Sequence, residues 1–261
     1  MTSTDLAPDT LRLLSANIQA GARTDRYRDY LTQSLNHVLP HASKRSNLEA
    51  IAASAREFDL VGLQESDPGS LRSGFLNQTH YLAELAGFPF WSHQANRRLG
   101  RLATSANALL SRHEPSEVRD YALPGRVKGR GVLWARFELA AGDLVVLIAH
   151  LSLGAQSRLA QLGFIAELLH DAPNAVLMGD LNCETHASEL SQFLKRSGMQ
   201  EPRDRLPSYP SWQPKRAIDH ILTSPGVEVH RRWLLPTLAS DHLAVGAEIS
   251  LRTGEIESAG D

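Results

Sequence analysis

Polar residues capable of acid–base or metal chemistry stand at the ends of several apolar runs spread along the chain. The segments that contain them read SANIQ at 15–19, LQESD at 63–67, IAHLS at 148–152, MGDLN at 178–182, AIDHIL at 217–222 and SDHLAV at 240–245. Each apolar run is typical of a buried strand, so each polar residue stands where a strand should end. Because the spacing is too wide for a local metal loop, the fold must gather these residues. Asp, Glu, Asn and His together are what metal-assisted hydrolysis of a phosphate ester requires.

The segment Gly179-Asp180-Leu181-Asn182 has the most specific spacing. Strand alternation would place Asp180 and Asn182 on one side, and the glycine lets the backbone turn tightly. A carboxylate and a carboxamide placed in this way suit a general base beside a hydrogen-bond donor to a phosphoryl oxygen. The alternative is an Asx-turn in which Asn182 caps a helix. Nothing in the sequence around Cys183 lowers the pKa of its thiol, so we interpret it as a packing residue.

Two Asp-His pairs near the C-terminus are the strongest indication of catalytic chemistry in the sequence. Asp219-His220 is predicted to lie in a strand, and Asp241-His242 to open another strand. An imidazole needs a carboxylate partner that fixes its tautomer and holds its charge, and we expect Asp219 to serve His242 in this way across neighbouring strands. Asp241 then remains available to hold a cation. Since His220 alternates away from Asp219, we interpret it as an outer-face or supporting residue.

Asn17, Glu65 and His150 each allow two interpretations. Taken alone, they would be a turn-forming asparagine, a surface glutamate at a strand end and a structural histidine. Taken with the other segments, the Glu65 carboxylate points into a cleft, and the His150 imidazole donates a proton to a leaving oxygen. The other histidines are interpreted as solvent-facing or capping: His37, His41, His80, His93, His113, His170, His186 and His230.

The candidate ligand set is rich in oxygen and contains no cysteine. Such a set favours a hard octahedral cation, which predicts Mg²⁺ as the cofactor, with Mn²⁺ as an alternative. The cation would neutralise the phosphate and polarise the P–O bond. Zinc comes second because histidines are present, but no His-x₃-His pair or thiolate cluster supports it.

The elements that must position these residues form strand–helix–strand units mixed with hairpins. Strands are predicted at residues 11–18, 58–63, 106–111, 132–139, 144–151, 175–178, 218–223 and 243–251, with a hairpin turn at 141–143. Helices are predicted after a capping box at 46–49, up to residue 86 before Gly87, over 156–169 and over 188–196 before Gly198. The third helix is predicted to bury one face made of Leu159, Leu162, Ile165 and Leu169. This order is typical of mixed sheets covered by helices, in the α/β or α+β class.

Composition bounds the class of protein and its partners. The 261 residues are 42% hydrophobic and 21% charged, with no repeat or linker, which predicts a single domain over 1–261 with frayed ends at 1–9 and 253–261. A formal net charge of −2 gives no global attraction for nucleic acid or anionic membrane, although a local basic rim would suffice for a nuclease. The single cysteine, the acidic N-terminus and the absence of a long apolar run predict a cytoplasmic protein without a membrane span.

Basic residues gather at 97–101, 126–130 and 215–216. Most are interpreted as solvated loop residues. Trp212 and Arg216 are candidate substrate contacts, because an aromatic ring beside basic residues could stack on a base or meet a lipid. Core packing of Trp212 is an equally good interpretation.

In their order along residues 11–251, the segments resemble the endonuclease/exonuclease/phosphatase superfamily. This superfamily includes pancreatic-type deoxyribonuclease, AP endonucleases, inositol-polyphosphate 5-phosphatases and neutral sphingomyelinases. The resemblance implies a four-layer sandwich of two mixed β-sheets flanked by helices, with the site at one rim. The presence of Gln19 and His150, where AP endonucleases usually have Asp and Tyr, is more similar to the deoxyribonuclease and sphingomyelinase branches.

The resemblance also implies a role for each site residue. Glu65 would be the principal Mg²⁺ ligand with Asn17 beside it, and Asp241 would be a further ligand to metal or water. Asp180 would orient or deprotonate the attacking water, and Asn182 would bind a phosphoryl oxygen. A dyad of Asp219 and His242 would steady the developing charge, and His150 would be a second imidazole over the phosphate.

These interpretations predict a Mg²⁺-dependent hydrolase of a phosphoester, a phosphodiesterase and possibly a nuclease. Its substrate is left open between nucleic acid and a small phosphoester or phospholipid headgroup, and no obligate protein partner is evident. A non-catalytic binding module on the same scaffold is the alternative. It is disfavoured because such relatives typically lose site residues, whereas Glu65, Asp180, Asn182, Asp219 and His242 are all present.

Overall fold

The computed structural model describes residues 10–19, 42–99, 103–126, 128–235 and 240–252. The predicted frayed ends, together with His37 and His41, lie outside these residues. Within the described residues, no helix combines the length and apolar character needed to cross a membrane.

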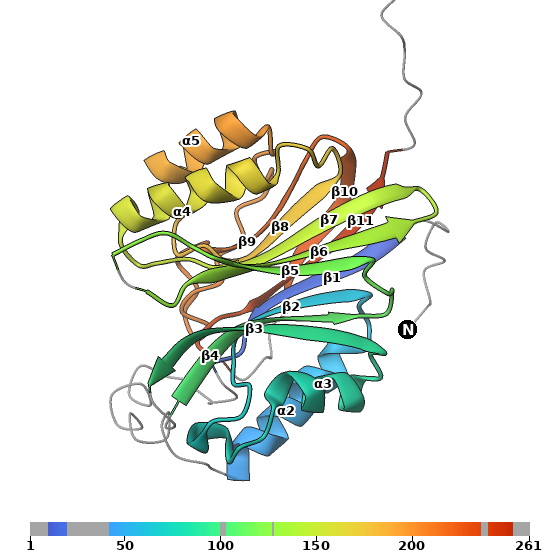
Figure 1. The fold of residues 1–261 in the computed structure, drawn as a ribbon, viewed down its shortest axis with the longest axis vertical. Coiled ribbons are helices and arrows are strands. Elements are labelled where there is room, and N and C mark those ends of the chain that lie inside the picture. Colours follow the sequence, from blue (N-terminus) through green and yellow to red (C-terminus); the bar gives the residue numbers. More distant parts are fainter. Residues whose placement is uncertain (1–9, 20–41, 100–102, 127, 236–239, 253–261) are drawn as a thin grey trace, which may run out of the picture.

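In the part of the chain that the structure describes, eleven strands form two mixed sheets. The six-stranded sheet has the order β10-β11-β1-β2-β4-β3, with β1 Thr10–Asn17, β2 Leu60–Ser66, β3 Phe90–Leu99, β4 Ala103–Ser111, β10 Val227–Leu235 and β11 Ala244–Leu251. The five-stranded sheet has the order β5-β6-β7-β8-β9, with β5 Glu117–Ala122, β6 Gly131–Leu139, β7 Gly142–His150, β8 Ala175–Asp180 and β9 Asp219–Thr223. The sheets lie face to face (Figure 1).

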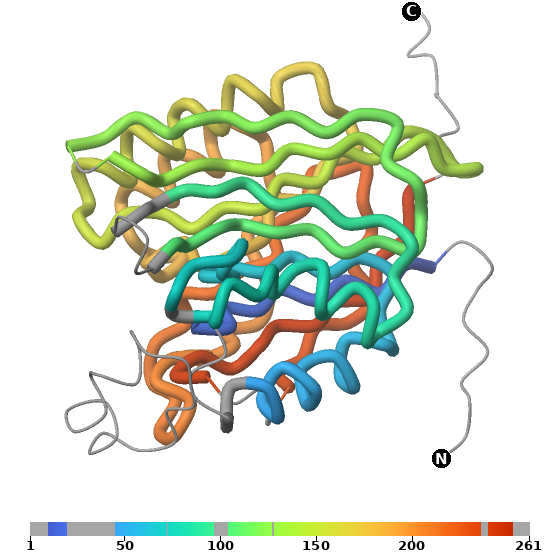
Figure 2. Tube along the Cα trace, turned by 60° about the horizontal axis from the view of Figure 1, so that its bottom comes forward, coloured from blue at the N-terminus to red at the C-terminus, as the bar shows by residue number. Residues whose placement is uncertain are grey.

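Helices cover the outer face of each sheet (Figure 1). Helices α2 (Ala42–Ala55) and α3 (Gln78–Ala86) lie on the six-stranded sheet, and α4 (Ala155–Leu168) and α5 (Ser188–Ser197) lie on the five-stranded sheet. A short 3₁₀ turn, η2, spans Leu71–Ser73. In Figure 2 the blue helix α2 and the yellow helix α4 lie on opposite sides of the strands. The predicted four-layer sandwich is therefore confirmed.

Strand alternation divides the apolar residues among three cores. Leu13 of β1 packs in the core between the sheets, whereas Leu14, the next residue, packs against α2 and α3. In the same way Val146 of β7 faces the other sheet and Leu147 faces α4 and α5. Successive side chains of a strand point to opposite faces, so a strand buried on both faces reads as one continuous apolar run.

Strand direction brings the candidate residues to a common edge. Strands β1 and β2 are parallel and pair Asn17 with Gln64 near their carboxyl ends. Strands β7 and β8 are also parallel and pair His150 with Asp180, while β9 runs antiparallel and pairs its first residue, Asp219, with Asp180. Carboxyl ends of parallel strands and amino ends of their antiparallel neighbours thus meet at one edge of each sheet.

Two helix predictions need correction. Helix α2 begins at Ala42, so Ser46 lies inside the helix and not in a capping box, because the preceding Ala, Lys and Arg are themselves good helix formers. Leu159 of α4 is exposed, since the buried face of this helix instead contains the polar residues Arg158 and Gln161. The predicted ends of α3 at Gly87 and of α5 at Gly198 are confirmed.

Three strands were not predicted, and all three form sheet edges. They are β3, β5 and β10, with the sequences FWSHQANRRL, EVRDYA and VEVHRRWLL. An edge strand has a neighbour on one side only and tolerates charge, so its sequence lacks the apolar run of a central strand. The predicted hairpin turn also shifts, because Gly142 already pairs with Leu139 as the first residue of β7.

Candidate active site

A cavity of about 450 Å³ collects most of the predicted site residues. Its lining comprises Asn17, Gln19, Glu65, Arg130, His150, Leu153, Asp180, Asn182, Tyr209, Arg216, Ile218, Asp241 and His242. Asp219 is buried directly behind His242. Trp212 is not among the described residues that line the cavity. The structure therefore gathers every predicted site residue except Trp212 around one cavity.

His242 and Asp219 form a hydrogen-bonded pair. The His242 Nδ1 atom lies 2.8 Å from Asp219 Oδ2, and Ser208 Oγ donates a hydrogen bond of 2.5 Å to the same oxygen. The expected contact is therefore present, but the expectation that it joins neighbouring strands is wrong, because Asp219 opens β9 of one sheet and His242 precedes β11 of the other. The pair spans the two facing sheets, and its geometry depends on how they pack.

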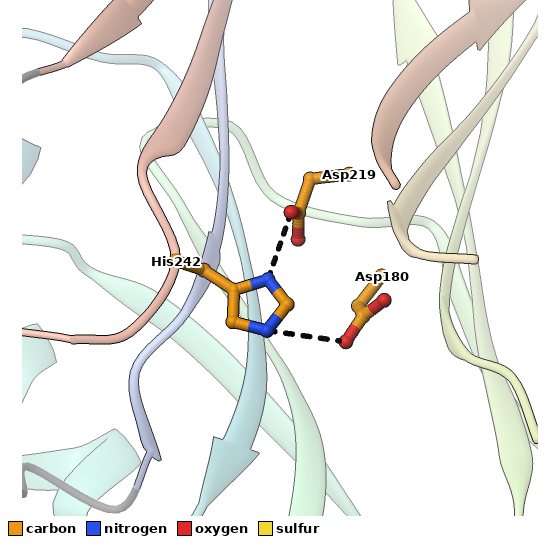
Figure 3. A group of neighbouring side chains, drawn as sticks. All are labelled: Asp180, Asp219 and His242. Atoms are coloured by element: carbon orange, nitrogen blue, oxygen red, sulfur yellow. Dashed lines mark hydrogen bonds and ion pairs between the residues drawn. The ribbon is translucent and has the colours of Figure 1, made fainter. Parts of the chain in front are cut away.

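Side chains of several site residues converge on a single oxygen of Asp180. Its Oδ2 lies 3.3 Å from His150 Nε2 and 3.9 Å from His242 Nε2, and it accepts a hydrogen bond of 3.2 Å from Asn17 Nδ2. Figure 3 shows the His242 ring between the carboxylates of Asp180 and Asp219. Burial raises the pKa of Asp180 to about 7, against the opposing effect of His242.

The two imidazoles of the cavity are in opposite states. Burial opposes the charged form of His242, but Asp219, Asp180 and Asp241 outweigh it and raise its pKa to about 10. Burial, together with the positive charges of Arg130 and His242, holds the pKa of His150 well below its ordinary value. At neutral pH His242 is therefore a cation that can stabilise negative charge, and His150 is neutral.

Glu65 has a left-handed backbone at a strand irregularity. Its φ is 59°, and the pairing of β2 with β4 shifts register between Leu63 and Ser66. Such a bulge re-aims a side chain at a cost in backbone strain. The Glu65 side chain is 31% exposed, and its Oε1 lies 3.9 Å from His150 Nδ1. The bulge thus directs a partly open carboxylate into the cavity.

Asn182 does not lie on the alternating strand that we expected. Strand β8 ends at Asp180, and Asn182 follows with a φ of 55°. Its backbone N–H donates 3.0 Å to Asp180 Oδ1, which is the Asx-turn alternative, and its Nδ2 donates 3.0 Å to Leu151 O. The helix-capping part of that alternative is wrong, because α5 begins later with Ala187 as its N-cap.

The oxygens of Glu65, Asp241 and Asn17 suit a hard cation. Burial and the like charge of Glu65 raise the pKa of Asp241 to about 6, against the opposing effect of His242. Ser240 Oγ donates 2.7 Å to Asn17 O, which ties the Asp241 segment to the end of β1. Two carboxylates close enough to repel each other in a buried site are stabilised by a divalent ion.

Asp180, Asp219 and His242 are also spaced closely enough to hold an ion. One donor atom of each lies within 4.8 Å of the others (Figure 3). However, Asp219 Oδ2 is already occupied by His242 and Ser208. The raised pKa of His242 favours a protonated imidazole between these carboxylates, so the oxygens on the Glu65 side of the cavity are the better candidates for holding a cation.

The sequence model of the Endonuclease/Exonuclease/phosphatase family matches residues 14–242. The chain belongs to this family. The match covers every candidate site residue, so the predicted resemblance is confirmed. Members of the family generally hydrolyse phosphoesters with the help of divalent metals. No curated protein matched this family member in sequence.

Solved structures share the fold of this family member at low sequence identity. An endonuclease/exonuclease/phosphatase from Beutenbergia cavernae is 21% identical, with a TM-score of 0.74 over 93% of this chain and 72% of that one. A mannosyl-6-phosphatase from Bacteroides thetaiotaomicron is 18% identical, with a TM-score of 0.68 over 92% of this chain and 100% of that one. The human nocturnin catalytic domain, solved with a bound sulfate, is 17% identical, with a TM-score of 0.70 over 95% and 96%.

Among the residues that line the cavity of this family member, sequence reasoning did not single out Tyr209 and Arg130. The Tyr209 ring lies 4.8 Å from the His242 ring, centroid to centroid, whereas Trp212 is half-buried and is not among the described residues that line the cavity. Tyr209 follows a loop serine, and no periodicity marks it. Arg130 belongs to the basic cluster that we had interpreted as solvated loop.

Two further histidines are buried or half-buried; for His220 this agrees with the supporting alternative and excludes the outer face. His220 is buried, and its Nε2 lies 2.8 Å from Cys183 O, so it supports the turn after β8 and does not face outward. His93, expected to face solvent, is half-buried, and burial lowers its pKa. Burial also raises the pKa of Cys183 to about 12, which agrees with a packing role.

Proposed function

We propose that this protein is a divalent-metal-dependent hydrolase that cleaves a phosphoester of a small molecule. The observation that supports it is the placement of Asp180 between a charged and a neutral imidazole on one cavity wall. A cavity of about 450 Å³ has the size of a site for a sugar phosphate, mononucleotide or lipid headgroup. We prefer these substrates to a polynucleotide, and we propose that the enzyme works in the cytoplasm.

In the proposed mechanism, Asp180 orients the attacking water and accepts its proton. Its raised pKa makes the carboxylate a better base than an exposed aspartate. His242, held charged by Asp219, stabilises the negative charge that develops on the phosphoryl oxygens. Asn182 contributes a hydrogen bond to a phosphoryl oxygen, and the neutral His150 imidazole donates an N–H hydrogen bond to the leaving oxygen.

Glu65, with Asn17 and Asp241, would hold the metal ion, for which we propose Mg²⁺ and alternatively Mn²⁺. When bound, the ion supplies charge neutralisation of the phosphate and polarisation of the P–O bond. The residues of this chain then determine where the phosphate lies and which oxygen receives a proton. Asn17 links the proposed metal ligands to the proposed general base, because its Nδ2 donates a hydrogen bond to Asp180.

Two neighbours in fold support a phosphate-binding cavity. One is named a mannosyl-6-phosphatase, and the other was solved with a bound sulfate anion. The activity in the first name and the anion bound in the second structure belong to those two proteins. For this chain they favour a test on small phosphomonoesters first.

The test is turnover of a substrate panel by the purified protein. The panel contains p-nitrophenyl phosphate, bis-p-nitrophenyl phosphate, sugar phosphates, phospholipids and labelled oligonucleotides, each with Mg²⁺, with Mn²⁺ and with EDTA. We expect turnover of small phosphoesters that EDTA abolishes and that Asp180→Asn lowers by roughly 10²–10⁴-fold. Absence of turnover on every phosphoester by a folded protein would favour the non-catalytic binding module, and preferential turnover of oligonucleotides would correct the substrate class.

A further inference from the structure

Arg130 is a cation held at the wall of the cavity. It is the last residue before β6, and it lines the cavity together with His150 and Glu65. Its backbone carbonyl accepts a hydrogen bond of 2.9 Å from Leu123 N–H, which closes the loop between β5 and β6. Its charge acts on His150. The side chain is half-buried, whereas Arg216, the other arginine of the described lining, is exposed.

A pair of buried amides fixes the backbone next to Arg130. Asn107 of β4 is completely buried, and its Nδ2 donates 2.8 Å to Gly131 O and 3.4 Å to Gln94 Oε1. Gln94 of β3 in turn donates 3.0 Å from Nε2 to Tyr121 O of β5. Two strands of one sheet therefore hold two strands of the other sheet at the point where Arg130 enters the cavity.

The amide pair is a costly way to fill space. Burying a carboxamide costs free energy unless hydrogen bonds compensate it, so apolar residues would pack here more simply. What the amides provide is a fixed position for the backbone of β6. Gly131 fits the same arrangement, because a Cβ atom there would lie 2.4 Å from Gln94 Oε1 and 2.5 Å from Asn96 Oδ1. The glycine permits the close approach of the amide to the chain.

We propose that Arg130 binds the non-bridging oxygens of the substrate phosphate, and that Asn107 and Gln94 position it. This proposal rests on the proposed function. The carboxylates of the cavity repel a phosphate, and a planar guanidinium can meet two phosphate oxygens at once. Because Arg130 is the less exposed of the two arginines, solvent screens its charge less than that of Arg216. Arg130 is thus a specificity-determining residue for the phosphate.

The first test measures binding of inorganic phosphate by isothermal titration calorimetry, once with Mg²⁺ and once with EDTA. Inorganic phosphate carries the same non-bridging oxygens as a phosphoester and requires no turnover. We expect Arg130→Met to weaken phosphate binding roughly 10- to 100-fold. Arg126→Met is the matched control, since Arg126 is exposed in the same loop and does not line the cavity, and it should bind as the unaltered protein does.

The second test separates positioning from general stability. Asn107→Leu keeps the side-chain size but removes the donor to Gly131 O, and it should weaken phosphate binding roughly tenfold. In an Arg130→Met background the same change should have no further effect, because the group that it positions is gone. An equal effect in both backgrounds overturns the positioning role. If Asn107→Leu does not fold, Gln94→Met, which removes the bond to Tyr121, replaces it.

Kinetics on p-nitrophenyl phosphate complete the design. Arg130→Met should raise KM by a factor similar to the loss of phosphate affinity, with a smaller change in kcat. Normal phosphate binding by Arg130→Met, or no phosphate binding by the unaltered protein in either buffer, overturns the proposal even if the enzyme turns over. Loss of phosphate binding in Arg130→Met without turnover by any variant supports the binding role and contradicts the proposed function alone.

Discussion

The carboxylate of Asp219 and the imidazole of His242 meet 2.8 Å apart, although Asp219 opens β9 of one sheet and His242 precedes β11 of the other. A dyad built in this way exists only when the two sheets are packed in the correct register. Ser208 fixes the carboxylate from a third segment, and the Tyr209 ring covers the imidazole. The charged state of His242 is therefore a property of the whole sandwich.

Removal of the dyad should abolish most activity, and its two members should act as a unit. His242→Asn should lower kcat by roughly 10²–10⁴-fold, because the group that stabilises phosphoryl charge is lost. Asp219→Asn should lower kcat less, and should have little effect once His242 is changed. Steady-state kinetics of the double-variant cycle check this, with Asp143→Asn, an exposed carboxylate, as the control. Multiplicative losses would show that the residues act independently.

Replacement of Glu65 should change the metal dependence more than the fold. Glu65→Gln is expected to raise the Mg²⁺ concentration for half-maximal activity by roughly tenfold or more, since one anionic ligand is lost. Mg²⁺ titrations of activity and calorimetric Mn²⁺ binding measure the change. Glu84→Gln, on the exposed side of α3, is the control. An unchanged metal affinity would exclude Glu65 as a ligand.

Tyr209, and not Trp212, should contribute to catalysis. Tyr209→Leu removes the ring that lies against His242 and should lower kcat/KM roughly two- to tenfold. Trp212→Leu should leave kcat/KM within about twofold, because Trp212 is not part of the described cavity lining. Comparison of the two variants on one substrate decides the point, and the reverse order would restore Trp212 as the substrate contact.

Gly179 should be indispensable for the pairing of β7 with β8. Its φ is 146°, and a Cβ atom there would lie 1.9 Å from Ala149 O, so Gly179→Ala should cost about 3 kcal/mol or more of unfolding free energy. Gly163→Ala in helix α4 meets only ordinary contacts and should be neutral or stabilise by up to about 1 kcal/mol. Urea unfolding measures the change in unfolding free energy for both variants. Equal stabilities of Gly179→Ala and Gly163→Ala would contradict this account of β8.

His220 should make the protein less stable in mild acid. Burial lowers the pKa of folded His220 below its ordinary value of 6.5, so the unfolded chain binds the proton first as pH falls. The resulting loss of unfolding free energy is absent above pH 6.5. Below that pH it grows by up to about 1.4 kcal/mol per pH unit, and it stops growing once the pH is below the pKa of folded His220. Urea unfolding at several pH values measures the difference between the unaltered protein and His220→Gln. A difference that does not vary with pH contradicts this linkage.

Sequence by itself determined the residue types at the strand ends and the layers that hold them. Continuous apolar runs such as Leu144–Ala149 mark strands buried on both faces, and they predict mixed sheets covered by helices. The division into two facing sheets was implied by the family resemblance. The same patterns could not show β3, β5 and β10, because an edge strand keeps a polar sequence.

Tertiary structure decided how the site residues meet. The sequence predicts Asp219 and His242 at strands, but only the packing of the sheets joins them. Only the carboxylates gathered there keep His242 charged, while burial leaves His150 neutral. The left-handed turn at Glu65 likewise depends on a bulge against β4. These features arise from contacts between segments far apart in the chain. The local conformational propensity of a segment does not reveal such contacts.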